Sequence, residues 1–90
     1  MTDIEKKGWE KGVRNVKALF EKSMKGYQVK SIADISDNLL VLYAEQPGKT
    51  GIGGGCYTVD KTTKIVKPVS SIMYIDEIEK AYDEGLAIDF

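Results

Sequence analysis

A glycine-rich run around a lysine and a threonine is the stretch of this chain that comes nearest to a nucleotide-binding motif. It reads GKTGIGGG at residues 48–55. A P-loop needs a glycine five residues before its Gly-Lys-Thr, so that backbone N–H groups surround the phosphates, and Tyr43 stands in that place. The dinucleotide-binding pattern fails too, because Cys56 occupies the position of its third glycine. Residues 56–60 read as a strand rather than the helix that both motifs require. We therefore expect residues 48–55 to form a loop between two strands.

Side chains suited to catalysis are scarce in this chain. The sequence contains no histidine, which is the commonest general base and the commonest metal ligand. Cys56 is the single cysteine, and without a histidine to activate it we interpret it as a small apolar residue. One cysteine can form neither an internal disulfide nor a four-cysteine metal site. We predict no enzymatic activity, no catalytic residue, no metal and no cofactor.

Carboxylates gather near the carboxy terminus, at Asp76, Glu77, Glu79, Asp83 and Glu84. On a helix, Asp76 is close to Glu79, and Glu79 is close to Asp83. A calcium loop instead spaces its oxygen ligands along irregular backbone with a glycine at the bend, and this stretch does not. Two interpretations remain: a solvated acidic face, or a surface that binds a basic protein partner.

Basic residues gather at the other end of the chain, at Lys7, Lys11, Arg14, Lys22 and Lys25. Residues 1–30 carry eight Lys/Arg against four Asp/Glu, whereas residues 61–90 carry four against six. These two regions either attract each other or face different partners. The basic stripe is a candidate phosphate contact, but a pI near 5.4 disfavours nucleic acid. Lys49 and Ile52, in the glycine-rich loop, are a further candidate contact for a protein partner.

Hydrophobic spacing predicts the elements that must position these residues. From Asp3 to Met24, apolar residues recur at helical spacing and Gly26 follows as a helix stop. The apolar arc consists of Trp9, Val13, Val16, Leu19, Phe20 and Met24, with the basic stripe opposite. Residues 27–35 alternate, with Tyr27, Val29, Ser31, Ala33 and Ile35 on one face, and residues 39–45 complete a hairpin.

A second hairpin is expected from residues 56–59 and 65–69, and Pro68 places its last strand at an edge or at its end. A second helix follows Ser70 or Ser71 and is capped by Gly85. Residues 86–90 suggest a short final strand or a strap over the core. The prediction is an α+β fold with an N-terminal amphipathic helix, an antiparallel four-stranded sheet from two hairpins, and a short C-terminal helix.

The composition is that of a soluble globular protein, at 42% apolar and 30% charged residues. Ninety residues fit a single domain spanning residues 1–90. No apolar run is long enough for a membrane helix, and the first residues lack the apolar core of a signal peptide. We therefore expect a cytoplasmic protein that makes no membrane contact.

The stretch GGGCYTVDKTTKI at residues 53–65 is followed by Val69-Ser70-Ser71 and by YIDEI at residues 74–78. Together with Tyr82, these residues resemble the second half of the YrhB-like family of small bacterial immunity proteins, over residues 53–85. The chain departs from that family at Cys56, where proline is usual, and in lacking a glycine after the Asp-Lys pair. The resemblance implies a cytoplasmic protein that binds and neutralises a partner toxin and has no catalysis of its own.

The predicted function is that of a small protein-binding domain, in the form of an immunity or inhibitor protein that acts by occluding its partner. One alternative is a phage- or mobile-element-encoded inhibitor of a nucleic-acid enzyme, acting by acidic mimicry. Another is a nucleic-acid-binding module that uses the basic stripe. A homodimer formed through Leu86, Ile88 and Phe90 is a further alternative.

Overall fold

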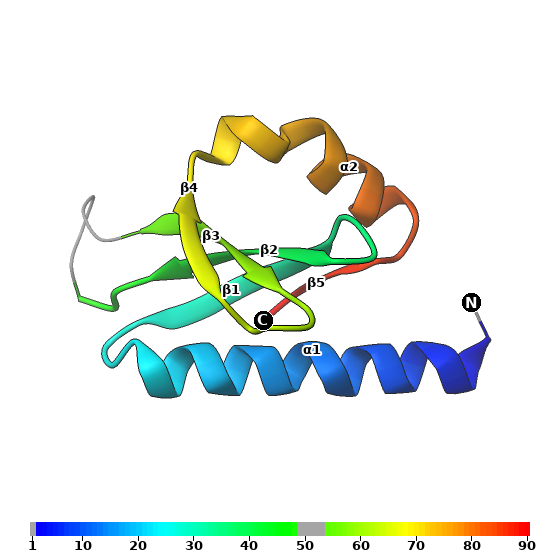
Figure 1. Ribbon diagram of the computed structural model, residues 1–90, viewed down its shortest axis with the longest axis horizontal. Helices are drawn as coiled ribbons and strands as arrows, with labels where there is room; N and C mark the ends of the chain where they lie inside the picture. Colours follow the sequence, from blue (N-terminus) through cyan, green and yellow to red (C-terminus); the bar gives the residue numbers. More distant parts are fainter. Residues whose placement is uncertain (1, 49–53) are drawn as a thin grey trace.

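The computed structural model describes residues 2–48 and 54–90, which form an α+β fold with one antiparallel sheet (Figure 1). Its elements are α1 (Asp3–Ser23), β1 (Gln28–Asp34), β2 (Leu39–Glu45), β3 (Gly55–Asp60), β4 (Val66–Val69), the 3-10 helix η1 (Ser71–Tyr74), α2 (Ile75–Asp83) and β5 (Ala87–Asp89). The strand order is β4-β3-β2-β1-β5. The helix–hairpin–hairpin–helix layout is confirmed. The prediction of four strands is wrong by one, because β5 returns after α2 to pair with β1.

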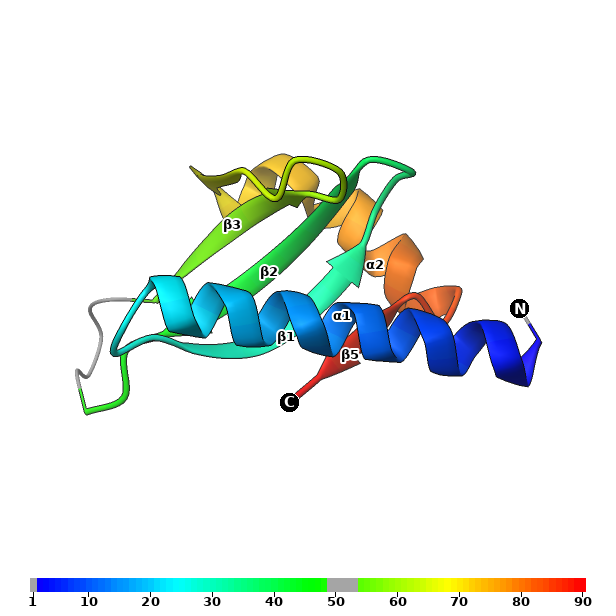
Figure 2. The same cartoon turned by 60° about the horizontal axis from the view of Figure 1, so that its bottom comes forward.

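The first helix forms where its apolar spacing predicts, and it crosses the strands obliquely (Figure 2). Thr2 caps it by accepting a hydrogen bond from the Glu5 N–H at 3.2 Å. Val13, Val16 and Phe20 are buried against the sheet. Leu19 belongs to the same predicted arc but is 52% exposed, because it lies beside the sheet rather than over it.

The main core lies between α1 and one face of the sheet. Each large aliphatic side chain buried there contributes about 1.5–3 kcal/mol to folding. Phe20, Tyr27 and Tyr57 close one end of this core, with ring centroids 5.2–6.4 Å apart. The strands supply the remaining buried members, which are Val29, Ile32, Leu40, Leu42, Ala44 and Val59.

A β-bulge in β1 changes which residues face α1. The predicted alternation places Val29 and Ile32 on opposite faces, and this is wrong, since both are fully buried in the α1 core. The register of β1 against β2 shifts between Val29 and Ser31, so one extra residue reverses the alternation. The Val29 N–H donates a 2.8 Å hydrogen bond to Glu21 Oε2 on α1. This bond anchors α1 to the bulged strand.

The opposite face of the sheet is covered by α2, so the two α-helices lie on opposite sides of the strands (Figure 1). Ala33 and Val41 pair across β1 and β2 on this face and are buried, and Ala81 of α2 is 2% exposed. The helix ends in a Schellman motif, in which the Leu86 N–H donates to the Ala81 carbonyl at 2.7 Å. Gly85 supplies the left-handed residue at φ +74°, which confirms it as the helix cap. The turn directs the chain into β5.

The two edges of the sheet are short strands. Pro68 lies in the edge strand β4, as its missing N–H predicts. The other edge is β5, in which Ile88 packs against the α1 core together with Phe90 at the end of the chain. Of the residues proposed for a homodimer, Ile88 and Phe90 therefore already contact the chain's own core, whereas the outer edge of β5 remains open.

Candidate protein-binding surface

The five predicted carboxylates are all exposed on α2 and the residue that follows it. Ala81 fixes the buried side of this helix. At 100° per residue, Asp76, Glu79 and Asp83 then project directly away from the sheet. Glu77 and Glu84 lie on the flank nearest the β1–β2 turn, where both line a shallow hollow. The helix therefore presents an acidic row with an acidic flank.

The hollow on this flank has a volume of about 290 Å³ and lies between α2 and the turn that follows β1. It brings Glu77 and Glu84 next to Asp37, a residue of that turn. Lys80 lines the same hollow and pairs with Glu84 at 3.9 Å, but both side chains are more than half exposed, so the pair is weak. Sequence reasoning missed Asp37, because 40 positions separate it from Glu77 and no local pattern relates the two.

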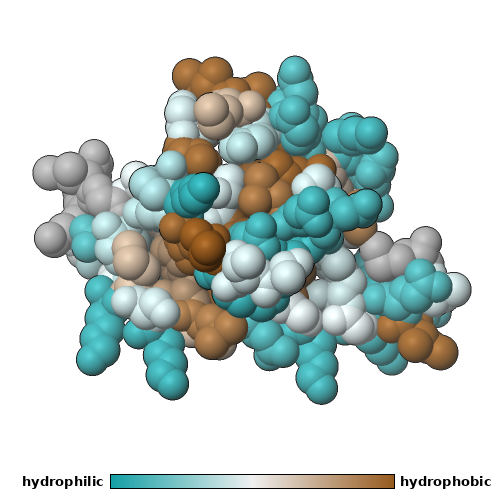
Figure 3. Space-filling model, in the orientation of Figure 1, coloured by the Kyte–Doolittle hydropathy of each residue, from teal (hydrophilic) through white to brown (hydrophobic). Residues whose placement is uncertain are grey.

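An exposed apolar edge adjoins the acidic row. Ile72 and Met73 of η1 are 77% and 64% exposed, and Ile75 at the start of α2 is 51% exposed. Figure 3 shows this edge as brown atoms over η1, beside teal atoms over α2. No local sequence pattern singled out these three residues as a surface. We call these three residues, the five carboxylates and Asp37 the α2 surface.

Repulsion between the carboxylates of the acidic row destabilises α2. Like charges three or four residues apart destabilise a helix by about 0.2–0.5 kcal/mol per pair. Asp76 and Glu77 suit the positive end of the helix dipole, but Asp83 and Glu84 lie at the negative end. Within residues 2–48 and 54–90, the only ion pair that involves the five carboxylates is Lys80–Glu84. A basic partner would relieve this repulsion.

The predicted basic stripe lies on the far side of the molecule. Lys7, Lys11, Arg14 and Lys22 are exposed on α1, on its face turned away from the sheet, and Lys25 is exposed in the turn just after the helix. Teal side chains extend below α1 in Figure 3. Arg14 lies 5.6 Å from the ring centroid of Phe90. The sheet separates the basic and acidic regions, so of the two sequence interpretations the structure supports different partners rather than mutual attraction.

Of the glycine-rich loop, the structure describes Gly48, Gly54 and Gly55. Lys49 and Ile52 lie outside the described residues. Gly55 begins β3, which confirms the predicted strand in the place where a P-loop would start a helix. A Cβ on Gly54 would lie 2.6 Å from the Tyr43 hydroxyl oxygen, so the close approach of that side chain favours glycine there. Gly55 is therefore part of a strand and Gly54 directly precedes it, which is not the arrangement of a phosphate-binding loop.

Cys56 lies half-buried in β3 opposite Tyr43 and Val69. Burial raises the pKa of its thiol, which keeps the thiol protonated and a poor nucleophile. In the parts of the chain that the structure describes, no group of three or more Cys, Asp or Glu side chains is placed to hold a metal ion. None of the described helices has the length and apolar character needed to cross a bilayer.

Comparisons with known proteins do not identify a family for this chain. A scan against protein-family models, a search of curated proteins and a search of solved structures each find no match to this chain. The resemblance to YrhB-like immunity proteins therefore stays a prediction. The α2 surface is the best candidate site, because it combines exposed apolar side chains with exposed carboxylates.

Proposed function

We propose that this protein binds a basic protein partner through the α2 surface and inhibits that partner by occluding it. The observation that carries the proposal is the exposed apolar edge of Ile72, Met73 and Ile75 beside the acidic row. Protein interfaces combine a buried apolar centre with a polar rim, and exposed apolar side chains gain most when a partner covers them. A helix face that only contacts solvent would not be expected to have exposed apolar side chains beside it.

Charge gives the partner its chemistry. The row formed by Asp76, Glu79 and Asp83 faces outward, and Asp37 extends the negative region beyond the helix. A partner with a basic surface would associate faster by electrostatic attraction, and that acceleration would weaken as salt rises. The surround of a nuclease active site has this character. An immunity protein that covers such a site, which is the role the family resemblance implies, fits the same surface.

Affinity capture with the tagged protein from its native cells tests the proposal, with bound protein and nucleic acid both identified. We expect a stoichiometric basic protein, which is then purified for titration. Lysine at Glu77, Glu79 and Asp83 should abolish this binding, and serine at Ile72 and Met73 should weaken it at least tenfold, as expected for central interface residues. All five positions are exposed, so circular dichroism should show unchanged folding.

A matched variant with glutamate at Lys7, Lys11 and Lys22 reverses charge on the opposite side of the sheet. It should bind the protein partner with unchanged affinity. If instead the captured material is nucleic acid that elutes with salt, and this variant loses it, the α2 proposal is wrong and the basic stripe of α1 is the binding surface.

A further inference from the structure

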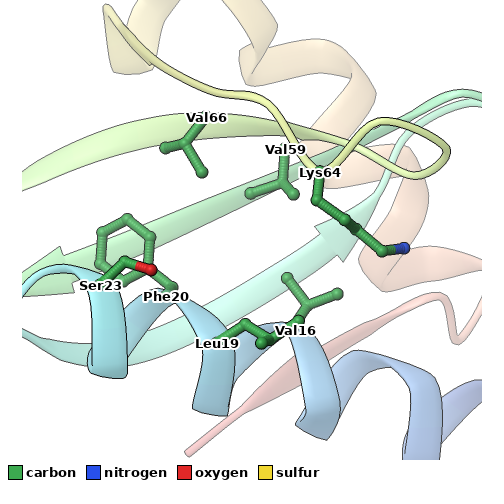
Figure 4. Close-up of a pocket in the computed structure, with 7 residues that line it drawn as sticks. All are labelled: Val16, Leu19, Phe20, Ser23, Val59, Lys64 and Val66. Atoms are coloured by element: carbon green, nitrogen blue, oxygen red, sulfur yellow. The ribbon is translucent and has the colours of Figure 1, made fainter.

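A groove runs along α1 beside β3 and β4, on the face of the sheet opposite α2. It consists of two hollows that share Val16 and Lys64 as lining residues. The first hollow has a volume of about 270 Å³ and is lined by Leu19, Phe20, Val59 and Val66 (Figure 4). The second has a volume of about 240 Å³ and is lined by Trp9, Gly12, Val13 and Leu40. Each is large enough for one large apolar side chain.

The walls of this groove are apolar and incompletely covered. Leu19 on α1 is 52% exposed and Val66 on β4 is 39% exposed, so the two face solvent across the groove. Gly8 and Gly12 form the helix wall of the second hollow, and a Cβ on either would meet no atom within 4 Å. Two glycines weaken a helix, and here they leave room beside it.

One strained lysine lies at the rim of both hollows. Lys64 has φ +63°, and it is the single non-glycine residue with a positive φ among residues 2–48 and 54–90. Its side chain descends from the β3–β4 turn toward α1 (Figure 4), and its ammonium donates to the Lys61 carbonyl. A strained residue at a groove rim, where glycine would fit the backbone better, points to a role for its side chain.

The charge of Lys64 is not neutralised by an ion pair with any carboxylate in the described parts of the chain. Asp34, which lines the second hollow, already accepts hydrogen bonds from Lys61 Nζ and from Trp9 Nε1. Asp60 accepts the N–H groups of Thr62 and Thr63 at 2.8 Å each, and these bonds lower its pKa most, with a smaller Coulombic contribution from Lys64, which forms no ion pair with it. The groove therefore offers two apolar hollows with one available cation between them.

We propose that this groove binds a segment of a partner protein that carries two apolar side chains about 12 Å apart with a carboxylate between them. The spacing follows from α1, because the helix residues that line the two hollows are centred roughly eight positions apart, at 1.5 Å per residue. An amphipathic helix with apolar residues seven positions apart matches it, which is the helix-in-groove mode of recognition. Lys64 selects an acidic segment, whereas the α2 surface selects a basic partner. The two surfaces are therefore independent.

The test uses the full chain labelled with ¹⁵N and three synthetic helical peptides of matched length. The first peptide has two leucines seven positions apart with two glutamates midway between them. The second replaces the glutamates with lysines, and the third replaces the leucines with serines. We expect the first to cause saturable amide shifts at Leu19, Phe20, Val59 and Val66. The second should bind roughly two- to fivefold more weakly, as for an exposed charge pair, and the third should not bind.

Variants of the protein separate charge from shape. Lys64→Met keeps the aliphatic stem and should reduce affinity for the glutamate peptide two- to fivefold, whereas affinity for the lysine peptide should not fall, because a like charge is removed. Lys64→Gly should also weaken binding, although it relieves the backbone strain and raises the melting temperature. Lys67→Met removes a charge from the other face of β4 and should change neither measurement.

Three outcomes would overturn the proposal. The first is equal affinity for the glutamate and lysine peptides. The second is the absence of saturable shifts in the groove. The third is a concentration-dependent dimer in light scattering that Leu19→Lys abolishes, because a second copy of the chain would then be the occupant. None of these outcomes affects the α2 proposal, whose variants lie on the opposite face of the sheet.

Discussion

Asp34 of β1 contacts both α1 and the β3–β4 turn, so replacing it measures how much these contacts contribute to the free energy of unfolding. Its Oδ2 accepts a hydrogen bond from Trp9 Nε1 at 2.9 Å, and its Oδ1 lies 2.6 Å from Lys61 Nζ. The Asp34 side chain is only 14% exposed, so solvent replaces these partners poorly. A hydrogen bond to a charged group contributes about 1.5–3 kcal/mol, and a partly exposed ion pair adds up to about 1 kcal/mol. We expect Asp34→Ala to lower the free energy of unfolding by about 2–3 kcal/mol.

Urea unfolding measures this loss, with the fluorescence of Trp9, the only tryptophan, and far-UV circular dichroism as two probes. The midpoint should fall at an unchanged m-value, and the melting temperature should fall by roughly 8–16 °C for a loss of about 2 kcal/mol. Asp34→Asn keeps an acceptor for Trp9 and should cost only about 1 kcal/mol. Asp37→Ala, in the exposed turn nearby, is the control and should stay within about 0.5 kcal/mol of the parent.

A double-mutant cycle with Trp9→Phe isolates the indole contact. The coupling free energy between Asp34 and Trp9 should be about 1–2 kcal/mol, since the two form a direct hydrogen bond. A coupling near zero, or an Asp34→Ala variant as stable as the Asp37→Ala control, would refute the reasoning. The Trp9–Asp34 hydrogen bond beside the second hollow would then make no measurable contribution to stability.

Three further predictions concern charge and backbone strain. Burial raises the pKa of Glu21, but hydrogen bonds from Lys17 and the Val29 N–H outweigh it and hold that pKa below its usual value of 4.5. Because the pKa is lowered in the folded state, the stabilisation from the Glu21 carboxylate is complete above pH 4.5 and is lost as pH falls through the folded-state pKa. Glu21→Gln should therefore make the free energy of unfolding less dependent on pH on the acid side. An unchanged pH dependence would contradict this. Lys64→Gly should raise the free energy of unfolding by up to about 1 kcal/mol in urea titrations, because glycine adopts positive φ without strain. A loss of stability would instead show that the aliphatic part of the lysine side chain stabilises the core. Gly85→Ala should lower the melting temperature by roughly 4–8 °C, for a cost of about 1 kcal/mol at φ +74°, and a shift below 1 °C would show that the helix cap is not strained.

The sequence predicted the elements that depend on local periodicity. The apolar spacing of Val13, Val16 and Phe20 specifies α1 to within one residue of its observed end, and Gly85 specifies the end of α2. Pro68 identified the edge strand, because a missing N–H is a property of the residue itself. The exposure of the five carboxylates followed from their density on a short helix.

Tertiary structure alone decided the features that depend on distant residues. The bulge beside Val29 reversed the faces of β1, and it is held by Glu21 from another element, so no alternation within the strand reveals it. The fifth strand required β1 to be free at its outer edge. Asp37 joined the acidic surface, and Lys64 came to lie over the groove, through contacts between separate segments. Periodicity is local, whereas pairing, surfaces and grooves arise only when separate segments pack together.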